Sequence, residues 1–143
     1  MYKKQADIRW SDMDPNFHLR HSVYYDLGAS TRISFLNDNG FTPNVLLQNQ
    51  IGPILFREEC VFKREVRFHD KVEIDLRLQK CRKDGSRWTM VHQLWKNETS
   101  LSAIITVDGA WIDLVNRKLA IPPAIIMNAF NTIPKTEDFK WLD

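Results

Sequence analysis

The chain has 143 residues, of which 43% are hydrophobic and 27% charged, and its formal net charge is +2. This length suits one domain, expected over residues 1–143, that buries its own core. So small a net charge gives the molecule no strong attraction to nucleic acid or to a membrane surface. No apolar run approaches the roughly 20 residues of a membrane span, and residues 1–10 lack the apolar segment of a signal peptide.

The two cysteines, Cys60 and Cys81, have no CxxC spacing, and the sequence does not resemble a small secreted, disulfide-rich domain. Reduced thiols and a cytoplasmic location are therefore expected. No set of His, Cys, Asp and Glu has the spacing of metal ligands, and no glycine-rich phosphate loop occurs. Neither a metal nor a bound cofactor is expected.

The first third of the chain predicts a strand, a loop and a helix. Residues 4–10 alternate weakly in hydrophobicity and predict a short strand, and the turn formers of residues 11–21 predict a loop. A helix is expected over about residues 22–37 and ends at Asn39-Gly40. Its apolar side chains recur at roughly the helical period: Val23, Leu27, Phe35 and Leu36. Gly28 lies in mid-helix, where glycine costs about 1 kcal/mol against alanine, so close packing is expected there.

After a connecting segment over residues 41–53, the hydrophobic period drops to two, which predicts strands. The expected strands cover residues 54–62, 72–79, 87–96 and 101–114. A hairpin turn is expected at residues 83–86, a bulge at Gly109, and a short apolar helix with a polar tail after Pro122-Pro123. One long helix and a run of antiparallel strands predict an α+β fold in which the sheet curls around the helix.

The segment from Trp10 to Tyr24, WSDMDPNFHLRHSVY, joins the first strand to the helix. It resembles the first motif of the 4-hydroxybenzoyl-CoA thioesterase-like family of hotdog proteins, in which a strand ends in Asp-x-Asp and a tyrosine opens the central helix. A Gly-Pro-Ile-Leu stretch at residues 52–55 is similar too, and the order of elements matches over nearly the whole chain. The resemblance implies a hotdog fold, with an antiparallel sheet wrapped around one long central helix, and hydrolysis of an acyl-CoA thioester.

The resemblance also implies residue roles. Asp14 falls where the family has its catalytic carboxylate, and Tyr24 matches the tyrosine near the helix start. His21 falls where some members carry a histidine, or where a backbone N–H meets the thioester oxygen. The sequence departs from the family pattern at Phe17, where glycine is common, and at Ala29, where many members have a glutamate.

The chemistry of the motif is plausible on its own terms. Thioester hydrolysis needs an activated water or an attacking carboxylate, with donors for the oxyanion that develops. The start of a helix offers free N–H groups and the positive end of the helix dipole. Asp14 precedes the helix closely enough to act on the same carbonyl, as general base or as nucleophile. The alternative is structural, because Asp-x-Asp-Pro-Asn is also a good turn and Asp12 is expected to bond within it.

Other candidates carry a functional and a structural interpretation side by side. His18 is expected either to contact the substrate or to pack in the loop. His21 is expected either to take part in catalysis or to point its ring into solvent. Tyr24 is expected either to take part in catalysis or to be a core aromatic residue. Glu58 shares a face of its strand with the apolar Phe56 and Cys60, so a carboxylate there needs a partner or a wet groove. A bulge that turns Glu58 outward is the alternative.

Lys83 and Arg87 flank the hairpin turn. In similar hotdog enzymes this region touches the phosphates of coenzyme A, and solvated hairpin charges are the alternative. The expected partner is an acyl-CoA, with an acyl-carrier-protein thioester or non-catalytic acyl-CoA binding as alternative functions. Because one sheet leaves unpaired edge strands, and because the family pairs its subunits, a homodimer or a tetramer made of two dimers is expected.

Overall fold

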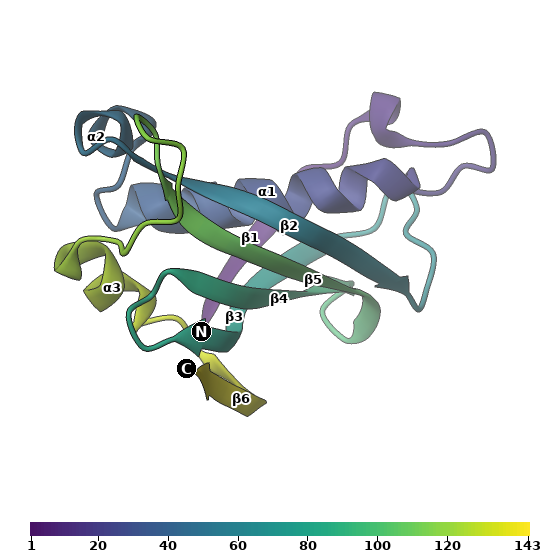
Figure 1. The fold of residues 1–143 in the computed structure, drawn as a ribbon. Coiled ribbons are helices and arrows are strands. Elements are labelled where there is room, and N and C mark those ends of the chain that lie inside the picture. Colours follow the sequence, from purple (N-terminus) through teal and green to yellow (C-terminus); the bar gives the residue numbers. More distant parts are fainter.

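The computed structural model describes residues 1–143 as a six-stranded sheet with helices (Figure 1). The strands are β1 (Tyr2–Ala6), β2 (Ile51–Phe62), β3 (Val72–Arg82), β4 (Arg87–Lys96), β5 (Ser100–Asp113) and β6 (Lys135–Leu142). The helical segments are the 3-10 turn η1 (Trp10–Asp12), α1 (His21–Asp38), α2 (Pro43–Gln48) and α3 (Ala124–Phe130). None of these helices is both long and apolar enough to cross a membrane.

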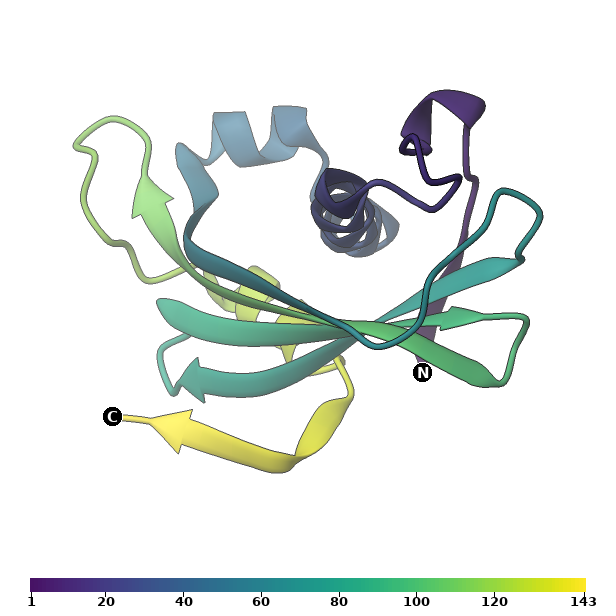
Figure 2. The same cartoon turned by 90° about the vertical axis from the view of Figure 1, so that its right-hand side faces the viewer.

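Five strands lie in the order β1-β3-β4-β5-β2, each antiparallel to its neighbour, and β6 pairs with β3 in parallel. The sheet curves around α1, which is seen end-on in Figure 2. One cluster of buried hydrophobic side chains joins α1 to β3, β4, β5 and α3. The predicted α+β arrangement, an antiparallel sheet curved around the longest helix, is confirmed.

In the edge strand β2, a bulge halfway along the strand shifts which side chains point to each face of the sheet. Between Leu55 and Arg57 its register with β5 slips by one residue, so Phe56 is the extra residue of a bulge opposite Gly109. The expectation that Phe56 and Glu58 share a face is therefore wrong, because the bulge lies between them. The bulge offered as the alternative for Glu58 is present and Glu58 is largely exposed, but its carboxylate still approaches Arg32 of α1, at 4.0 Å.

Three segments differ from their sequence prediction. The strand expected over residues 4–10 ends at Ala6 and is followed by η1. The connecting segment contains α2, whose N-cap Thr42 accepts a hydrogen bond from the N–H of Val45 at 3.3 Å. The polar tail forms β6 at the edge of the sheet. Each of these elements is short, and the sheet or the α1–β2 connection around it determines its conformation.

Candidate functional site

The loop between η1 and α1 forms a small hairpin around Asp14. A bridge pairs Met13 with Leu19, and Leu19 is buried in the core. Oδ1 of Asp14 accepts hydrogen bonds from the backbone N–H groups of Asn16, at 2.9 Å, and His18, at 3.1 Å. Oδ2 makes no hydrogen bond within the chain. One carboxylate oxygen therefore holds the turn, as the structural interpretation expects, while the other is available to a ligand.

Asp12, the first acid of the motif, has a structural role. Its side chain is buried and accepts three hydrogen bonds from Arg9, one from the backbone N–H and two from the guanidinium. The guanidinium bond holds the pKa of Asp12 below its usual value. Both carboxylate oxygens of Asp12 are committed to η1, as expected of a residue that bonds within the loop.

Phe17 stands at the tip of the same loop in a left-handed backbone conformation, with φ of 63°. A side chain is strained in that region, whereas glycine adopts it without steric penalty. This geometry gives a physical reason why glycine suits the position in the family that the motif resembles. The phenyl ring of Phe17 is 68% exposed and so gains little from packing.

The start of α1 presents unused donors. Its N-cap, Arg20, is extended, and its side chain, which donates to Oγ of Ser22, offers no acceptor to the backbone N–H groups of the first turn. The backbone N–H groups of His21 and Ser22 have no acceptor within the chain. Together with the positive end of the helix dipole, they suit an oxygen that becomes negative during a reaction.

The loop, the start of α1 and the end of β2 enclose one open depression. Four of the predicted site residues line it: Asp14, His18, His21 and Tyr24. Lys63 and Arg64, which follow β2 directly, line it as well, and the sequence interpretation missed them. A pair of basic residues at the end of a strand was the available signal, but its proximity to Asp14 depends on how β2 and α1 pack together.

The two histidines have different surroundings. Nε2 of His18 lies 2.8 Å from Oε2 of Glu65, so the ring is held at the rim of the depression. The His21 side chain is exposed to solvent. The part of His21 that can bind a substrate oxygen is its backbone N–H, which has no acceptor within the chain. No three His, Cys, Asp or Glu side chains are placed to hold a metal ion.

Tyr24 lines the depression, and Cys60 lies close to it. Tyr24 is 3% exposed and packs edge-to-face on Phe62, with 4.9 Å between the ring centroids. Burial, with smaller contributions from Cys60 and Asp14, raises the pKa of Tyr24 to about 12, and burial raises the pKa of Cys60 to about 11. Both groups are protonated at neutral pH. Neither is a base or a nucleophile in that state, so Asp14 is the candidate for these roles in the depression.

Glu58, on β2, belongs to a second set of polar side chains, which lies beside a later part of α1. Its Oε2 lies 4.0 Å from Nη2 of Arg32, and Nη1 of Arg32 lies 2.9 Å from Nε2 of His92. Nδ1 of His92 donates to the carbonyl of Asp75 at 2.7 Å, so Nε2 is the acceptor for Arg32. Burial, together with the Arg32 charge, lowers the pKa of His92 to about 3, and the ring is neutral.

Gly28 makes room for this pair. A Cβ atom at Gly28 would lie 3.3 Å from Arg32 Nη1 and 3.3 Å from His92 Cδ2, and the glycine is buried. The close packing predicted for a mid-helix glycine is confirmed.

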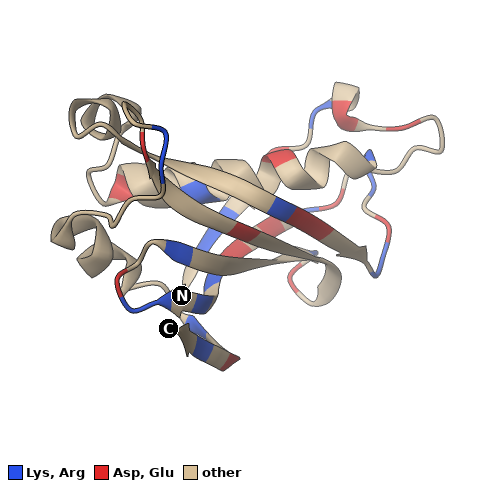
Figure 3. Cartoon of the chain, in the orientation of Figure 1, with Lys and Arg blue, Asp and Glu red and all other residues tan.

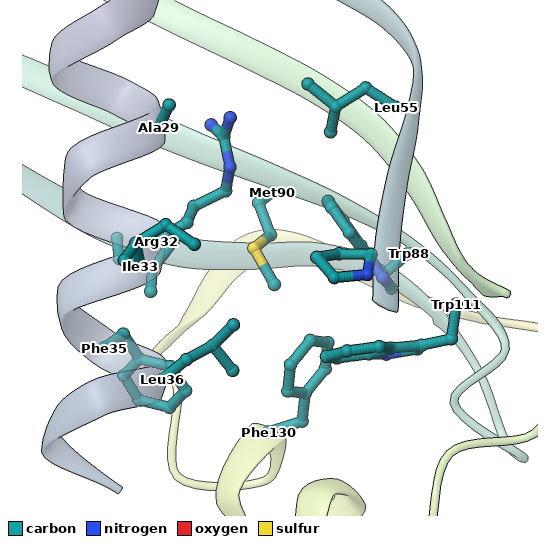
Figure 4. A pocket seen from close by; sticks show the side chains of 12 residues that line it. Ala29, Arg32, Ile33, Phe35, Leu36, Leu55, Trp88, Met90, Trp111 and Phe130 are labelled. Carbon is teal, nitrogen blue, oxygen red and sulfur yellow. The ribbon is translucent and has the colours of Figure 1, made fainter. Parts of the chain in front are cut away.

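Beyond Arg32 an apolar cavity of about 170 Å³ lies between α1, the sheet and α3 (Figure 4). Aromatic rings from three different elements line it, namely Trp88, Trp111 and Phe130. The sequence interpretation missed the cavity and Arg32, because its walls come from residues far apart in the chain.

Lys83 and Arg87 lie away from this site. Their hairpin packs against α3, at the end of the sheet opposite the loop before α1, as Figures 1 and 3 show. The guanidinium of Arg87 lies 4.8 Å from the ring centroid of Phe56 and lines a basic hollow with Lys80 and Arg82. Within one chain, the structure does not bring the predicted phosphate contacts and Asp14 together.

Comparisons with known proteins place this geometry in context. The family model of the thioesterase-like superfamily matches residues 8–130. No curated protein matches the chain.

Solved structures share the fold at low sequence identity. A hypothetical protein from Staphylococcus aureus in complex with CoA is 14% identical, with a TM-score of 0.85 over 99% of this chain and 89% of that one. A 1,4-dihydroxy-2-naphthoyl-CoA thioesterase from Synechocystis is 14% identical, with a TM-score of 0.81 over 92% and 96%. A hypothetical protein from Thermus thermophilus is 17% identical, with a TM-score of 0.82 over 93% and 99%.

Proposed function

Because the chain belongs to the thioesterase-like superfamily and is a thioester hydrolase of the hotdog fold, we propose that it cleaves an acyl-CoA with Asp14 as the catalytic carboxylate. The observation that carries this proposal is the placement of Asp14 Oδ2. It makes no hydrogen bond within the chain, and Asp14 shares a depression with His21 at the start of α1. The carboxylate and the donors that a thioester needs thus lie together.

In the proposed reaction, the thioester carbonyl oxygen accepts hydrogen bonds from the unused N–H groups of His21 and Ser22, which stabilise the oxyanion. With Asp14 as general base, a water molecule loses a proton to Oδ2 and attacks the carbonyl carbon. The C–S bond then breaks, and the coenzyme A thiolate takes up the proton to leave a free acid. With Asp14 as nucleophile, a mixed anhydride forms first and water hydrolyses it. Tyr24, protonated and at the same site, is proposed as a hydrogen-bond donor to the substrate.

The coenzyme A end of the substrate has two candidate contacts. Lys63 and Arg64 line the depression and take part in no ion pair with the acidic Glu65 beside them, which binds His18 and Arg67 instead. Lys83 and Arg87, the contacts expected from the sequence, reach the same substrate only from another subunit. His18, at the rim of the depression, is proposed to contact the substrate as well. The CoA bound to the Staphylococcus aureus structure supports a CoA ligand on this fold.

The proposed assembly is a homodimer, or a tetramer of two dimers. β2 is an edge strand of 12 residues that pairs on one side alone, with β5. Most of its residues are exposed, including the apolar Leu55, Val61 and Phe62. Long apolar edge strands are regularly covered in native proteins, and a second copy of β2 would cover this one. We also propose a cytoplasmic location, since Cys60 and Cys81 are both free thiols.

Release of free thiol from a panel of acyl-CoAs tests the proposed function. We expect turnover with one or more acyl-CoAs and little with the same acyl groups on a carrier protein. The reverse preference indicates the carrier-protein alternative. Tight binding of acyl-CoA without thiol release contradicts hydrolysis and indicates a binding protein.

A further inference from the structure

A single charged side chain lines the apolar cavity. Arg32 is the only charged residue in its walls, and 11% of its side chain is exposed. Figure 4 shows its guanidinium turned toward Ala29, at the end of the cavity nearest the start of α1. Helical side chains tilt toward the helix N-terminus, so the guanidinium lies beside Gly28, four residues earlier in the chain.

The hydrogen bonding of Arg32 is incomplete. A guanidinium has five N–H donors, and the chain offers it one acceptor, Nε2 of His92 at 2.9 Å. Oε2 of Glu58, at 4.0 Å, is beyond hydrogen-bond distance. The indole N–H groups of Trp88 and Trp111 are also buried in the cavity walls without an acceptor. Buried donors without acceptors are unfavourable, so the cavity suits an occupant that carries an oxygen.

The charges around Arg32 favour a neutral oxygen over an anion. Glu58 balances the charge of Arg32, and His92 is neutral because its pKa lies far below neutrality. A hydroxyl group accepts and donates at once. It can accept from Arg32 and donate to Glu58, and so bridge the 4.0 Å between them.

We propose that Arg32 makes the enzyme selective for acyl groups that carry a hydroxyl in mid-chain and end in a short apolar segment. The position of the hydroxyl rests on the proposed function, which puts the thioester at the amide of His21. Gly28 lies seven residues further on, about 10 Å along the helix at 1.5 Å per residue. An extended chain advances about 1.2 Å per bond, as the 3.8 Å spacing of Cα atoms over three bonds implies. About eight bonds from the carbonyl carbon span this distance, so the hydroxyl falls on about the eighth or ninth carbon of the acyl chain.

The cavity beyond Arg32 limits the rest of the acyl group. Its volume of about 170 Å³ is similar to that of an engineered apolar cavity of about 150 Å³ that binds benzene. A few methylene groups fit this space. The proposal therefore has a medium to long hydroxyacyl chain run along α1, with its thioester in the depression at Asp14 and its end against the rings of Trp111 and Phe130.

The test compares dodecanoyl-CoA with the same ester hydroxylated near the eighth carbon and, as a positional control, next to the thioester. We expect kcat/KM to be roughly tenfold higher for the mid-chain hydroxyl, the effect of one hydrogen bond to a charged group. Arg32→Met should remove this preference. Arg57→Met, which changes an arginine of β2 that has 58% of its side chain exposed and does not line the cavity, should keep it.

Two further measurements separate the possible failures. If Arg32→Met unfolds because His92 loses its donor, Arg32→Gln restores that donor and should still lower the preference. The free hydroxy acid should raise the melting temperature of the wild type more than dodecanoic acid does, and Arg32→Met should abolish the difference. Equal kcat/KM for all three esters overturns the inference and leaves the hydrolase function standing. Selective binding of the hydroxy acid without hydrolysis of any ester supports the cavity selectivity and overturns the proposed function.

Discussion

At the scale of single residues, the two acids of the motif have opposite surroundings. Asp12 has both oxygens bonded to Arg9, whereas Asp14 has one oxygen bonded to the backbone of its loop and one free. Asp12 was expected to bond within the turn, and it does, whereas Asp14 was expected to be catalytic, with a turn role as the alternative, and one of its oxygens does hold the turn. The difference between them is a matter of a single unpaired oxygen, which the spacing of residues in the sequence could not reveal.

Replacing Asp14 by Asn should lower turnover about 100- to 10,000-fold, the usual contribution of a general acid–base group. The loss should appear in kcat more than in KM, because the carboxylate acts mainly in the transition state. The amide oxygen of Asn can still accept from the N–H groups of Asn16 and His18, so the fold should persist. Steady-state thiol release and the melting temperature measure the two effects.

Asp12→Asn and Glu58→Gln are the matched controls for Asp14→Asn. Asp12→Asn should lower the melting temperature, since it weakens charge-assisted bonds to Arg9, and should leave kcat within a few-fold. Loss of kcat in Glu58→Gln with normal turnover in Asp14→Asn would move the catalytic carboxylate to β2. Early melting of Asp14→Asn would instead favour its structural interpretation.

His92 should make the fold sensitive to mild acid. Its pKa is about 3 in the folded chain against 6.5 for an ordinary histidine. Below pH 6.5 the unfolded chain therefore binds a proton that the folded chain does not, and the free energy of unfolding falls as the pH drops toward 3. One proton corresponds to about 1.4 kcal/mol per pH unit.

Urea unfolding between pH 7 and pH 5 measures this effect. His92→Gln can still donate to Asp75 and accept from Arg32, and it should lose about 2 kcal/mol less than the wild type over that range. His69→Gln, which changes an exposed histidine, should follow the wild type. Parallel curves for wild type and His92→Gln would contradict the buried neutral ring.

At the scale of elements, hydrophobic periodicity predicted the secondary structure of the long segments and failed for the short ones. The helix expected over residues 22–37 is α1, from His21 to Asp38, and the strand expected over residues 87–96 is β4. Both carry enough turns or alternations for a pattern to emerge. The 6-residue α2 is too short for a helical stripe, and β6 forms because the edge of β3 is available to pair with it. A bulge was expected at Gly109, and the structure has it directly opposite, at Phe56 of β2, because the register of the two strands decides which of them carries the extra residue.

The loop that contains Asp14 should be more stable with a glycine at its tip than with another residue. Phe17 has φ of 63° and an exposed ring, so its side chain contributes strain and little packing. We expect Phe17→Gly to be about 1 kcal/mol more stable than Phe17→Ala, which keeps the strain. Chemical denaturation of the two variants measures the difference. Equal stabilities would show that the loop adjusts its backbone when the ring is removed.

The two basic segments can be separated by charge reversal. Lys63→Glu/Arg64→Glu changes the pair beside Asp14, and Lys83→Glu/Arg87→Glu changes the pair at the hairpin near α3. A double variant that removes phosphate contacts should raise KM for acyl-CoA and leave kcat nearly unchanged, because the binding it loses is the same in the ground and transition states. We expect this for the first pair in every assembly, and for the second pair if a neighbouring subunit supplies it. An unchanged KM would show that the pair makes no phosphate contact and is simply solvated.

At the scale of the whole molecule, the chain offers two sites of different character at the two ends of α1. The polar depression lies at the start of the helix, and the apolar cavity lies near its end, with Arg32 between them. The fold class followed from the order of elements, but the walls of the cavity come from six elements that only the folded chain brings together. The alternation of β2 also could not tell that its outer edge lacks a partner strand, which is what suggests a second subunit.

The chain should be a dimer at micromolar concentration, with β2 at the interface. Val61 is 45% exposed on this strand, and a lysine on an edge strand opposes pairing with another edge. Val61→Lys should therefore weaken the dimer at least tenfold in sedimentation velocity. It should lower activity in parallel on the proposal that Lys83 and Arg87 of a neighbouring subunit bind the substrate. Val115→Lys is the matched control, since it adds the same charge at a 62% exposed valine after β5, and it should remain dimeric and active. A wild-type chain that sediments as an active monomer would contradict both the interface and the shared site, and it would leave Lys63 and Arg64 as the phosphate contacts available to Asp14 within one chain.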